Sequence, residues 1–191
     1  MRIGILGGSF DPPHLGHISI ARQVRELMKL DQIWLMPYYE HSWDSSASSA
    51  HHRFAMTKLV EEKEIIVSDE EIKFKKRSYA IQTVKRLKKK YPHVFFWIIG
   101  GDVLPDFTKW KDYEKLITEI KFIIVPRKGF SFPAKFPAKI QKGFLLIPSP
   151  EFITSDISSS IIRRNIKEGR PVTGLISKPV LSYIQKHQLY E

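Results

Sequence analysis

Short apolar runs alternate along this chain with longer segments that carry apolar side chains at helical spacing. Residues 3–6 form the first apolar run and residues 32–36 the second. Between them, the segment 15–29 repeats apolar side chains three and four positions apart, which is typical of a helix with one buried face. A strand, a helix and a strand in this order predict a βαβ unit, in which the two strands lie parallel.

The same alternation continues to the end of the chain. The run 94–99 (Val-Phe-Phe-Trp-Ile-Ile) is the most apolar one and is too short for a helix, so it is predicted as a central strand buried on both faces. Residues 71–75 alternate and are predicted as a short edge segment. The remaining strands are expected at about 64–67, 121–125 and 144–147, and the remaining helices at about 51–62, from 78, from 157 to 169 and from 177.

These elements indicate the α/β fold class. We predict a Rossmann-like single domain over residues 1–191, with a central, mostly parallel sheet, helices on both of its faces, and a small C-terminal helical segment over about 157–191. In such a sheet, ligands bind beyond the carboxyl ends of the strands. Candidate functional residues are therefore expected directly after the predicted strands.

A glycine-rich turn with two histidines follows the first predicted strand. Residues 7–17 read Gly-Gly-Ser-Phe-Asp-Pro-Pro-His-Leu-Gly-His. The glycines let the backbone approach a ligand closely, and the free N–H groups at the start of the next helix attract an anion. His14 and His17 lie one helical turn apart and so face the same side. The turn has neither the lysine of a P-loop nor the spacing of the dinucleotide fingerprint; we interpret it as another kind of phosphate site, with a plain strand-to-helix turn as the alternative.

A serine cluster near the C-terminus predicts a second anion site. Residues 157–163 read Ile-Ser-Ser-Ser-Ile-Ile-Arg at the expected start of a helix. One serine suffices as an N-cap, so three hydroxyls together with the guanidinium of Arg163 point to phosphate binding. We expect this helix start to meet the histidine-bearing turn in space, where the two together would hold a triphosphate.

A carboxylate follows the predicted central strand. Gly100 and Gly101 precede Asp102. A carboxylate just past a central parallel strand is well placed to accept hydrogen bonds from ribose hydroxyls. A simple Gly-Gly-Asp turn is the alternative interpretation.

Together these motifs resemble the His-x-Gly-His nucleotidyltransferase superfamily, in the form found in nicotinate-nucleotide adenylyltransferases. The matching forms are Gly-Gly-(Ser/Thr)-Phe-Asp-Pro-x-His-x-Gly-His at 7–17, Gly-x-Asp at 100–102, and Ile-Ser-(Ser/Ala)-Thr-x-Ile-Arg at 157–163, where a serine replaces the threonine. The resemblance extends from about Arg2 to Tyr190. It implies catalytic roles for His14, His17 and Arg163. It implies ATP binding by Gly7, Gly8, Ser9, Phe10, Gly16, Gly100, Asp102, Ile157, Ser158, Ser159 and Ser160.

Two further segments resemble the family's binding elements for the acceptor nucleotide. Residues 78–83 resemble its Ser-Tyr-Thr-x-x-Thr element, with alanine in place of the middle threonine, and Ser78 is also expected to cap the following helix. Residues 107–113 resemble its Phe-x-x-Trp-x-x-(Tyr/Leu) segment, in which the tryptophan stacks on the pyridine ring; a core tryptophan is the alternative. The resemblance implies acceptor binding by Tyr79, Ala80, Thr83, Trp110 and Lys111.

The connections between these motifs are less informative. Residues 38–50 are polar and rich in serine, and we expect a mobile loop over the site. This loop lacks the family's asparagine, its two prolines and its basic residue, so the acceptor stays open among nicotinate mononucleotide, nicotinamide mononucleotide and another phosphorylated molecule. Residues 51–53 resemble the family's His-Arg element. The connection 126–143 has no clear period, although its start, Pro-Arg-Lys-Gly, resembles the family's Arg-x-Gly turn.

Composition narrows the class of protein. The chain has 191 residues and no cysteine, which excludes a disulfide framework, a thiolate zinc site and a cysteine nucleophile. It opens directly on a predicted strand and has no apolar run of membrane-spanning length, so we expect a cytoplasmic protein without membrane contact. The formal net charge is +11, but the densest basic cluster, at 85–90, lies on one predicted helix. We therefore do not expect nucleic acid as a partner, because phosphorylated small molecules explain the sign of the charge equally well.

Adenylyl transfer is the reaction that these parts favour. The phosphate of a mononucleotide is largely dianionic near neutral pH, with a second pKa of about 6, so it can attack the α-phosphorus of ATP without a general base. No acidic ligand cluster is visible, so Mg²⁺ is expected to arrive with ATP, and no protein metal site is predicted. The resemblance implies that ATP and nicotinate mononucleotide give nicotinate adenine dinucleotide and pyrophosphate, a step of NAD biosynthesis. A non-catalytic nucleotide- or RNA-binding protein is the remoter alternative, and the sequence is compatible with a homo-oligomer.

Overall fold

The computed structural model describes residues 1–40, 48–77, 79–127 and 141–191. In this part of the chain, six strands form one sheet in the order β3-β2-β1-β4-β5-β6, and every neighbouring pair is parallel. The α/β class with a parallel central sheet is thus confirmed. The strands are β1 (Arg2–Gly8), β2 (Gln32–Pro37), β3 (Ile65–Val67), β4 (Val94–Gly100), β5 (Lys121–Val125) and β6 (Phe144–Leu146).

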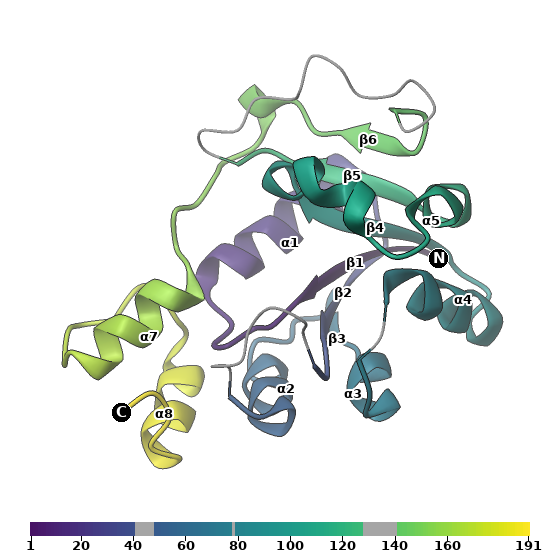
Figure 1. Ribbon diagram of the computed structural model, residues 1–191. Coiled ribbons are helices and arrows are strands. Elements are labelled where there is room, and N and C mark those ends of the chain that lie inside the picture. Colours follow the sequence, from purple (N-terminus) through teal and green to yellow (C-terminus); the bar gives the residue numbers. More distant parts are fainter. Residues whose placement is uncertain (41–47, 78, 128–140) are drawn as a thin grey trace.

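Helices cover both faces of this sheet (Figure 1). On one face lie α1 (Leu15–Leu27) and α2 (Ala50–Lys58). The helices α7 (Ser159–Lys167) and α8 (Lys178–Lys186) lie beyond the strand ends and add side chains to the same core. Those that pack on the other face are α4 (Ala80–Lys90), the 3₁₀ helix η1 (Gly101–Lys109) and α5 (Tyr113–Glu119). The connections contain the short helix α3 (Glu70–Phe74) and the 3₁₀ turn η2 (Ser149–Glu151).

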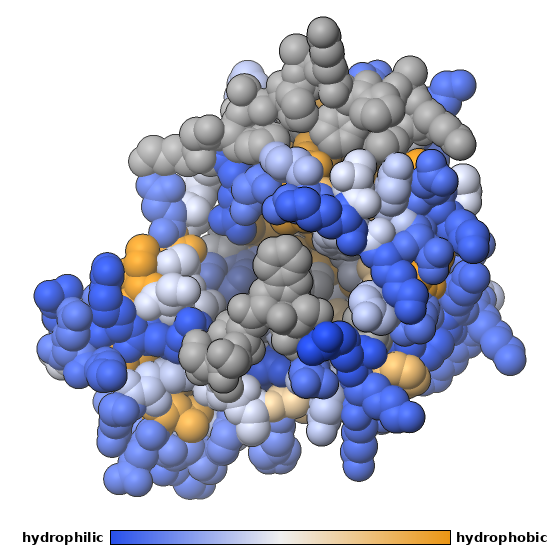
Figure 2. All heavy atoms as spheres, viewed as in Figure 1, coloured by the Kyte–Doolittle hydropathy of each residue, from blue (hydrophilic) through white to orange (hydrophobic). Residues whose placement is uncertain are grey.

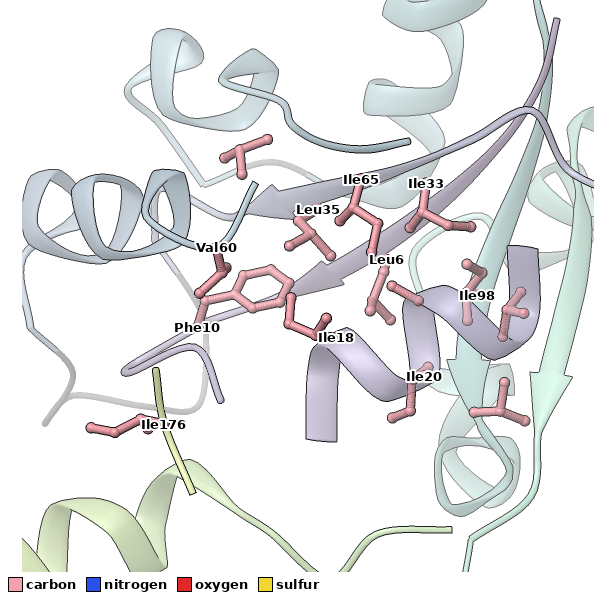
Figure 3. Close-up of a cluster of buried hydrophobic side chains, with 14 of the residues drawn as sticks. Leu6, Phe10, Ile18, Ile20, Ile33, Leu35, Val60, Ile65, Ile98 and Ile176 are labelled. Atoms are coloured by element: carbon pink, nitrogen blue, oxygen red, sulfur yellow. The ribbon is translucent and has the colours of Figure 1, made fainter. Parts of the chain in front are cut away.

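The strands divide their side chains between two apolar cores. From β1, Ile3 and Ile5 enter the core under α4, whereas Leu6 enters the core under α1. β4 likewise sends Trp97 to the first core and Ile98 to the second. Figure 3 shows the core under α1, where side chains of β1, β2 and β4 meet those of the helix. Because both faces of these strands are buried, their sequences are unbroken apolar runs, as predicted for β4.

The structure corrects one predicted element. Residues 71–75, predicted as a short edge segment of the sheet, lie mostly in α3 instead. Glu70 and Glu71 occupy the first turn of that helix, where carboxylates interact favourably with the helix dipole. Glu71 also turns inward and accepts a hydrogen bond from the Thr83 hydroxyl. A five-residue segment is too short for its hydrophobic period to distinguish a strand from a single helical turn.

Other boundaries move by a few residues. β1 continues to Gly8 and so includes both glycines of the turn, two residues beyond the predicted end. α2 ends at Lys58 rather than near residue 62. Ser158 takes the N-cap position of α7, and its hydroxyl accepts from the backbone N–H of Ile161 at 3.3 Å. A helix N-cap has an extended backbone, so the helix proper starts later than the motif.

Some expectations fall on parts of the chain that the structure leaves out. Residues 41–47 of the serine-rich loop, the predicted cap Ser78 and residues 128–140 of the long connection lie outside the described residues. The C-terminal helical segment packs on the core under α1 through Val180 and Ile184 of α8. A single domain over residues 1–191 stays a prediction. Within the described ranges, no helix is long and apolar enough to cross a membrane.

Candidate active site

The sheet reverses its order of connection between β1 and β4. β1 leads through α1 to β2 on one side, whereas β4 leads to β5 on the other. Ligands bind in the crevice that such a reversal opens at the carboxyl ends of the strands. The face of the molecule in Figure 2 is largely hydrophilic where its residues are coloured, with a few apolar patches. A cavity of about 200 Å³ is lined by His14, Gly16, His17, Ile20, Arg127, Ser155, Ile157, Ser158 and Ser159.

The two imidazoles are stacked at the start of α1. The ring centroids of His14 and His17 are 3.7 Å apart, with 23° between the ring planes. The backbone N–H of His14 donates to Nδ1 of His17 at 3.2 Å, so in the neutral ring of His17 the proton sits on Nε2. Phe10 packs edge-on against His17 at 4.8 Å. The structure thereby fixes which nitrogen of His17 can donate to a ligand.

Gly16 makes room for the first imidazole. A Cβ at this position would lie 3.0 Å from Cε1 and Nδ1 of His14 and 3.1 Å from Oγ of Ser155. Any side chain would therefore displace the ring or the serine. Nδ1 of His14 is buried and has no hydrogen-bond partner within the described part of the chain.

Both imidazoles are uncharged near neutral pH. Burial, assisted by the charge of Arg127, lowers the pKa of His14 from 6.5 to about 4. Burial, His14 and Arg127 together hold the pKa of His17 well below its usual value. Before a ligand binds, these rings therefore contribute N–H dipoles and lone pairs, not positive charge.

This lowered pKa predicts a loss of stability in mild acid. A histidine that is neutral in the folded protein binds protons more readily in the unfolded chain, so His14 stabilises the fold fully above pH 6.5 and progressively less as the pH falls toward 4. Between about pH 7.5 and about pH 5, we expect this residue to cost about 2 kcal/mol of unfolding free energy. Urea unfolding at both pH values should show a smaller pH dependence in His14→Gln than in the parent. Parallel pH dependences of the two proteins would contradict the assignment.

The serine-bearing start of α7 docks directly on this turn. Oγ of Ser159 donates to the carbonyl of Pro12 at 2.8 Å. The backbone N–H of Ile157 donates to Oγ of Ser155 at 3.2 Å, which shapes the approach to the helix. The expected meeting of the two helix starts is confirmed, since Ser158 and Ser159 line the same cavity as the imidazoles. Ser160 is exposed and lies outside the lining, whereas Ser155, which the sequence did not single out, belongs to it.

Arg163 lies beside the turn but does not line the cavity. Its Nη1 donates to the carbonyl of Asp11 at 2.7 Å and lies 3.9 Å from Oδ2 of the same residue. The Asp11–Pro12 peptide bond is cis. In this arrangement the guanidinium holds the turn in place.

Arg127 supplies the cation that the sequence prediction left out of the site. It follows β5, lines the cavity, and places Nε 3.6 Å from Oδ1 of Asp102. Asp102 curls over Gly100, where a Cβ would lie 2.1 Å from Oδ1 and 3.1 Å from Nε of Arg127. The Arg-x-Gly turn was the signal that could have identified this residue. Asp102, the predicted ribose-binding residue, is thus paired with the guanidinium of Arg127 in this structure.

A buried arginine supports the turn from the α2 side. Arg53 is 2% exposed, and its guanidinium donates to the carbonyls of Ser9, Tyr38, Tyr39 and Ser48 at 2.7 to 3.0 Å. These bonds join the glycine-rich turn after β1 to the segment that follows β2. The His-Arg element therefore contributes a structural arginine rather than a ligand.

The predicted acceptor residues are divided between surface and interior. Tyr79 is exposed at the N-cap position of α4, and Nζ of Lys111 lies 4.4 Å from the centre of its ring. Trp110 is partly buried, and its ring centroid lies 5.4 Å from that of Phe107. It therefore packs on the core, as a core tryptophan does, and keeps part of its ring exposed for stacking on a ligand. Thr83 is fully buried, and its hydroxyl donates to the carboxylate of Glu71. Ala80 is partly buried against the core under α4.

Comparison with known proteins identifies the family. Residues 5–165 match the model of the cytidylyltransferase-like family. A probable nicotinate-nucleotide adenylyltransferase of Oceanobacillus iheyensis is 38% identical, over 98% of this chain and 96% of that protein. One of Bacillus licheniformis is 36% identical, over 100% and 98%. The chain belongs to the nicotinate-nucleotide adenylyltransferase family. It is a nucleotidyltransferase.

Solved structures agree with this family and its fold. A Plasmodium falciparum nicotinic acid mononucleotide adenylyltransferase complexed with NaAD superposes with a TM-score of 0.80 at 27% identity, covering 99% of this chain and 97% of that one. A putative nicotinate-nucleotide adenylyltransferase of Vibrio parahaemolyticus has a TM-score of 0.71 at 18% identity, covering 99% and 94%, and shares the fold. The Rossmann-like architecture of the adenylyltransferase is thereby confirmed.

The donor set of the adenylyltransferase cavity suits anions better than metal ions. Within the described residues, no group of three histidine, cysteine or carboxylate side chains is arranged to hold a metal. The lining offers hydroxyls, imidazoles, a guanidinium and two helix N-termini. Such groups donate hydrogen bonds, and phosphate oxygens accept them.

Proposed function

We propose that this adenylyltransferase transfers the adenylyl group of ATP to nicotinate mononucleotide, giving nicotinate adenine dinucleotide and pyrophosphate. The observation that carries the proposal is the single cavity in which the start of α1, the start of α7 and Arg127 meet at the reversal of the sheet. The printed names of the relatives and the NaAD complex of the Plasmodium enzyme support the acceptor.

In the proposed reaction, one phosphate is attacked by another. A phosphate oxygen of nicotinate mononucleotide forms a bond to the α-phosphorus of ATP, and the bond from that phosphorus to the oxygen of pyrophosphate breaks. With a second pKa of about 6, the attacking phosphate needs no general base. This fits a cavity whose imidazoles are neutral and whose only charged lining group within the described residues is a guanidinium. Rate enhancement then comes from position and from the stabilisation of charge.

The residues divide this work among three groups. We assign the triphosphate to the N–H groups at the start of α1 and α7, to Nε2–H of His17 and to Arg127, with His14 completing the lining. We assign the ribose to Asp102, which is released from Arg127 when the phosphates take that cation. The glycines of the turn, Gly7 and Gly8, leave the backbone open to ATP.

The acceptor is assigned to the start of α4 and the end of η1. Free N–H groups at the start of a helix favour a carboxylate over an uncharged amide, and the first turn of α4 carries no acidic side chain. Lys111, held over Tyr79, adds a positive charge beside it. Mg²⁺ is part of the substrate in this proposal and enters with the triphosphate; a cytoplasmic location accords with these substrates.

Turnover with a pair of acceptors tests the proposal. With ATP and Mg²⁺, we expect pyrophosphate release with nicotinate mononucleotide, and a value of kcat/KM at least about tenfold lower with nicotinamide mononucleotide, because one missing charge interaction has about that effect. Equal values would assign the enzyme to both acceptors. No pyrophosphate with either acceptor would exclude pyridine nucleotides and favour another phosphorylated molecule as the acceptor.

A further inference from the structure

We infer that Tyr190 is a positioning residue for the phosphate-binding turn and that it acts through Asp11. The inference rests on the proposed adenylyl transfer. The phenol hydroxyl donates to Oδ1 of Asp11 at 2.5 Å, across 179 positions of sequence. Asp11 lies in the turn between β1 and α1 and is fully buried. Tyr190 does not line the cavity, so any effect on the reaction must pass through its partner.

Asp11 joins three parts of the chain. Its Oδ1 accepts from Tyr190, and its Oδ2 accepts from the backbone N–H of Ser48 at 2.9 Å. Its backbone oxygen accepts from Nη1 of Arg163, which fixes the residue from the α7 side. A buried carboxylate is costly unless its oxygens receive hydrogen bonds. Without the Tyr190 hydroxyl, Oδ1 has no donor among the described residues, and we expect the side chain to reorient.

A reorientation of Asp11 reaches the cavity over a short, stiff path. Two prolines, Pro12 and Pro13, separate Asp11 from His14, and proline rings fix one backbone dihedral angle each. The carbonyl of Pro12 is the acceptor on which Ser159 docks. A shift at Asp11 therefore moves an imidazole and the start of α7 together. Both belong to the lining that holds the leaving phosphates in the proposed reaction.

Tyr190 is suited to hold this position. The neighbouring backbone N–H of Leu189 donates to the carbonyl of Ile184 at 3.1 Å, which ties the segment to α8. The phenol oxygen also lies 3.9 Å from Sδ of Met56. Burial, together with the charge of Asp11, raises the pKa of Tyr190 above its usual value. The hydroxyl thus remains a proton donor throughout the pH range in which the enzyme works.

A matched pair of phenylalanine variants of the full chain tests the inference. Tyr190→Phe removes one hydroxyl at the turn, and Tyr183→Phe removes one from α8, where it bonds Nδ1 of His52 at 3.0 Å. For Tyr190→Phe we expect kcat with ATP and nicotinate mononucleotide to fall about tenfold, the size of one hydrogen bond to a charged group. KM for ATP should change by less than about threefold, because the lining acts on charge that develops during the reaction. Tyr183→Phe should retain the parent kcat.

Hydrogen–deuterium exchange of residues 9–17 supplies a second, independent measurement. We expect faster exchange in Tyr190→Phe than in the parent, and parent-like exchange in Tyr183→Phe. A parent-like kcat in Tyr190→Phe overturns the inference even if its Tm falls, because the contact would then stabilise the fold without positioning the turn. If the parent itself releases no pyrophosphate, the proposed function fails, and the exchange rates then decide the inference: equal rates in parent and Tyr190→Phe overturn it.

Discussion

Replacing His17 by alanine should lower kcat for pyrophosphate release by a factor of about 10² to 10³. The ring presents a single N–H donor, on Nε2, because its Nδ1 accepts from the backbone of His14. Removal of one preorganised donor to charge that develops in a transition state has this size of effect. The low pKa of the free ring keeps its Nδ1 unprotonated before ATP binds, so Nδ1 can accept from the backbone of His14 and hold the Nε2 donor in one orientation.

The control for this variant is another histidine to alanine. His51 is exposed on α2 and lies outside the cavity lining, so His51→Ala should keep the parent kcat. His17→Ala loses the stacking with His14 and the edge contact with Phe10, and its Tm should fall only modestly. Steady-state rates measured well below the Tm of each variant separate activity from stability. A kcat within threefold of the parent in His17→Ala would remove the role proposed for the ring.

Replacing Arg127 by alanine should lower kcat/KM for ATP about a hundredfold. Its guanidinium lines the cavity beside both imidazoles, and the side chain is exposed enough to be removed without a packing defect. Charge-assisted hydrogen bonds to phosphate are about twice as strong as neutral ones. Arg127→Lys should recover only part of the loss, because an ammonium keeps the charge but lacks the planar fork.

The same variant should change the titration of the imidazoles. The charge of Arg127 contributes to the low pKa of His14 and of His17, so the pKa of His14 should rise in Arg127→Ala, as followed by NMR of the ring protons. Arg170→Ala is the matched control, since Arg170 is exposed and pairs with Glu168 at 2.8 Å outside the cavity. Equal ATP kinetics in the two variants would show that Arg127 takes no part in phosphate binding.

The sheet could be predicted because its strands are buried on both faces. Runs such as Val94–Gly100 contain almost only apolar side chains. A short run of this kind is typical of a parallel strand that is buried on both faces. The segment 71–75 was predicted wrongly because it is too short for its pattern to distinguish a strand from a helical turn, and because Glu71 is buried through a hydrogen bond from Thr83. That partner lies on α4, and no local pattern reveals it.

The site could be predicted in part, where the chemistry lies within one motif. His14, His17 and the serines at the start of α7 share local signals of helix starts and phosphate binding. The starts of α1 and α7 meet because of the order of the strands in the sheet. The βαβ pattern of the sequence predicts the parallel pairing of β1 and β2, which is part of that order. The Arg-x-Gly turn marked Arg127, but its place beside the imidazoles depends on β5 lying beside β4, and the contact of Arg163 with the turn depends on the position of Asp11. Both are properties of the folded chain.

The contacts that complete the phosphate-binding turn span 147, 152 and 179 positions of sequence. Contacts of such long range require the ends of the chain to be brought together, at the cost of loop-closure entropy. Nucleotide should therefore bind the fully folded chain alone and protect both of its ends at once. At a hundred times its Kd, a ligand of this kind adds about 2.7 kcal/mol to the free energy of unfolding, so ATP should slow proteolysis near the C-terminus as strongly as at the N-terminal turn where we propose that it binds.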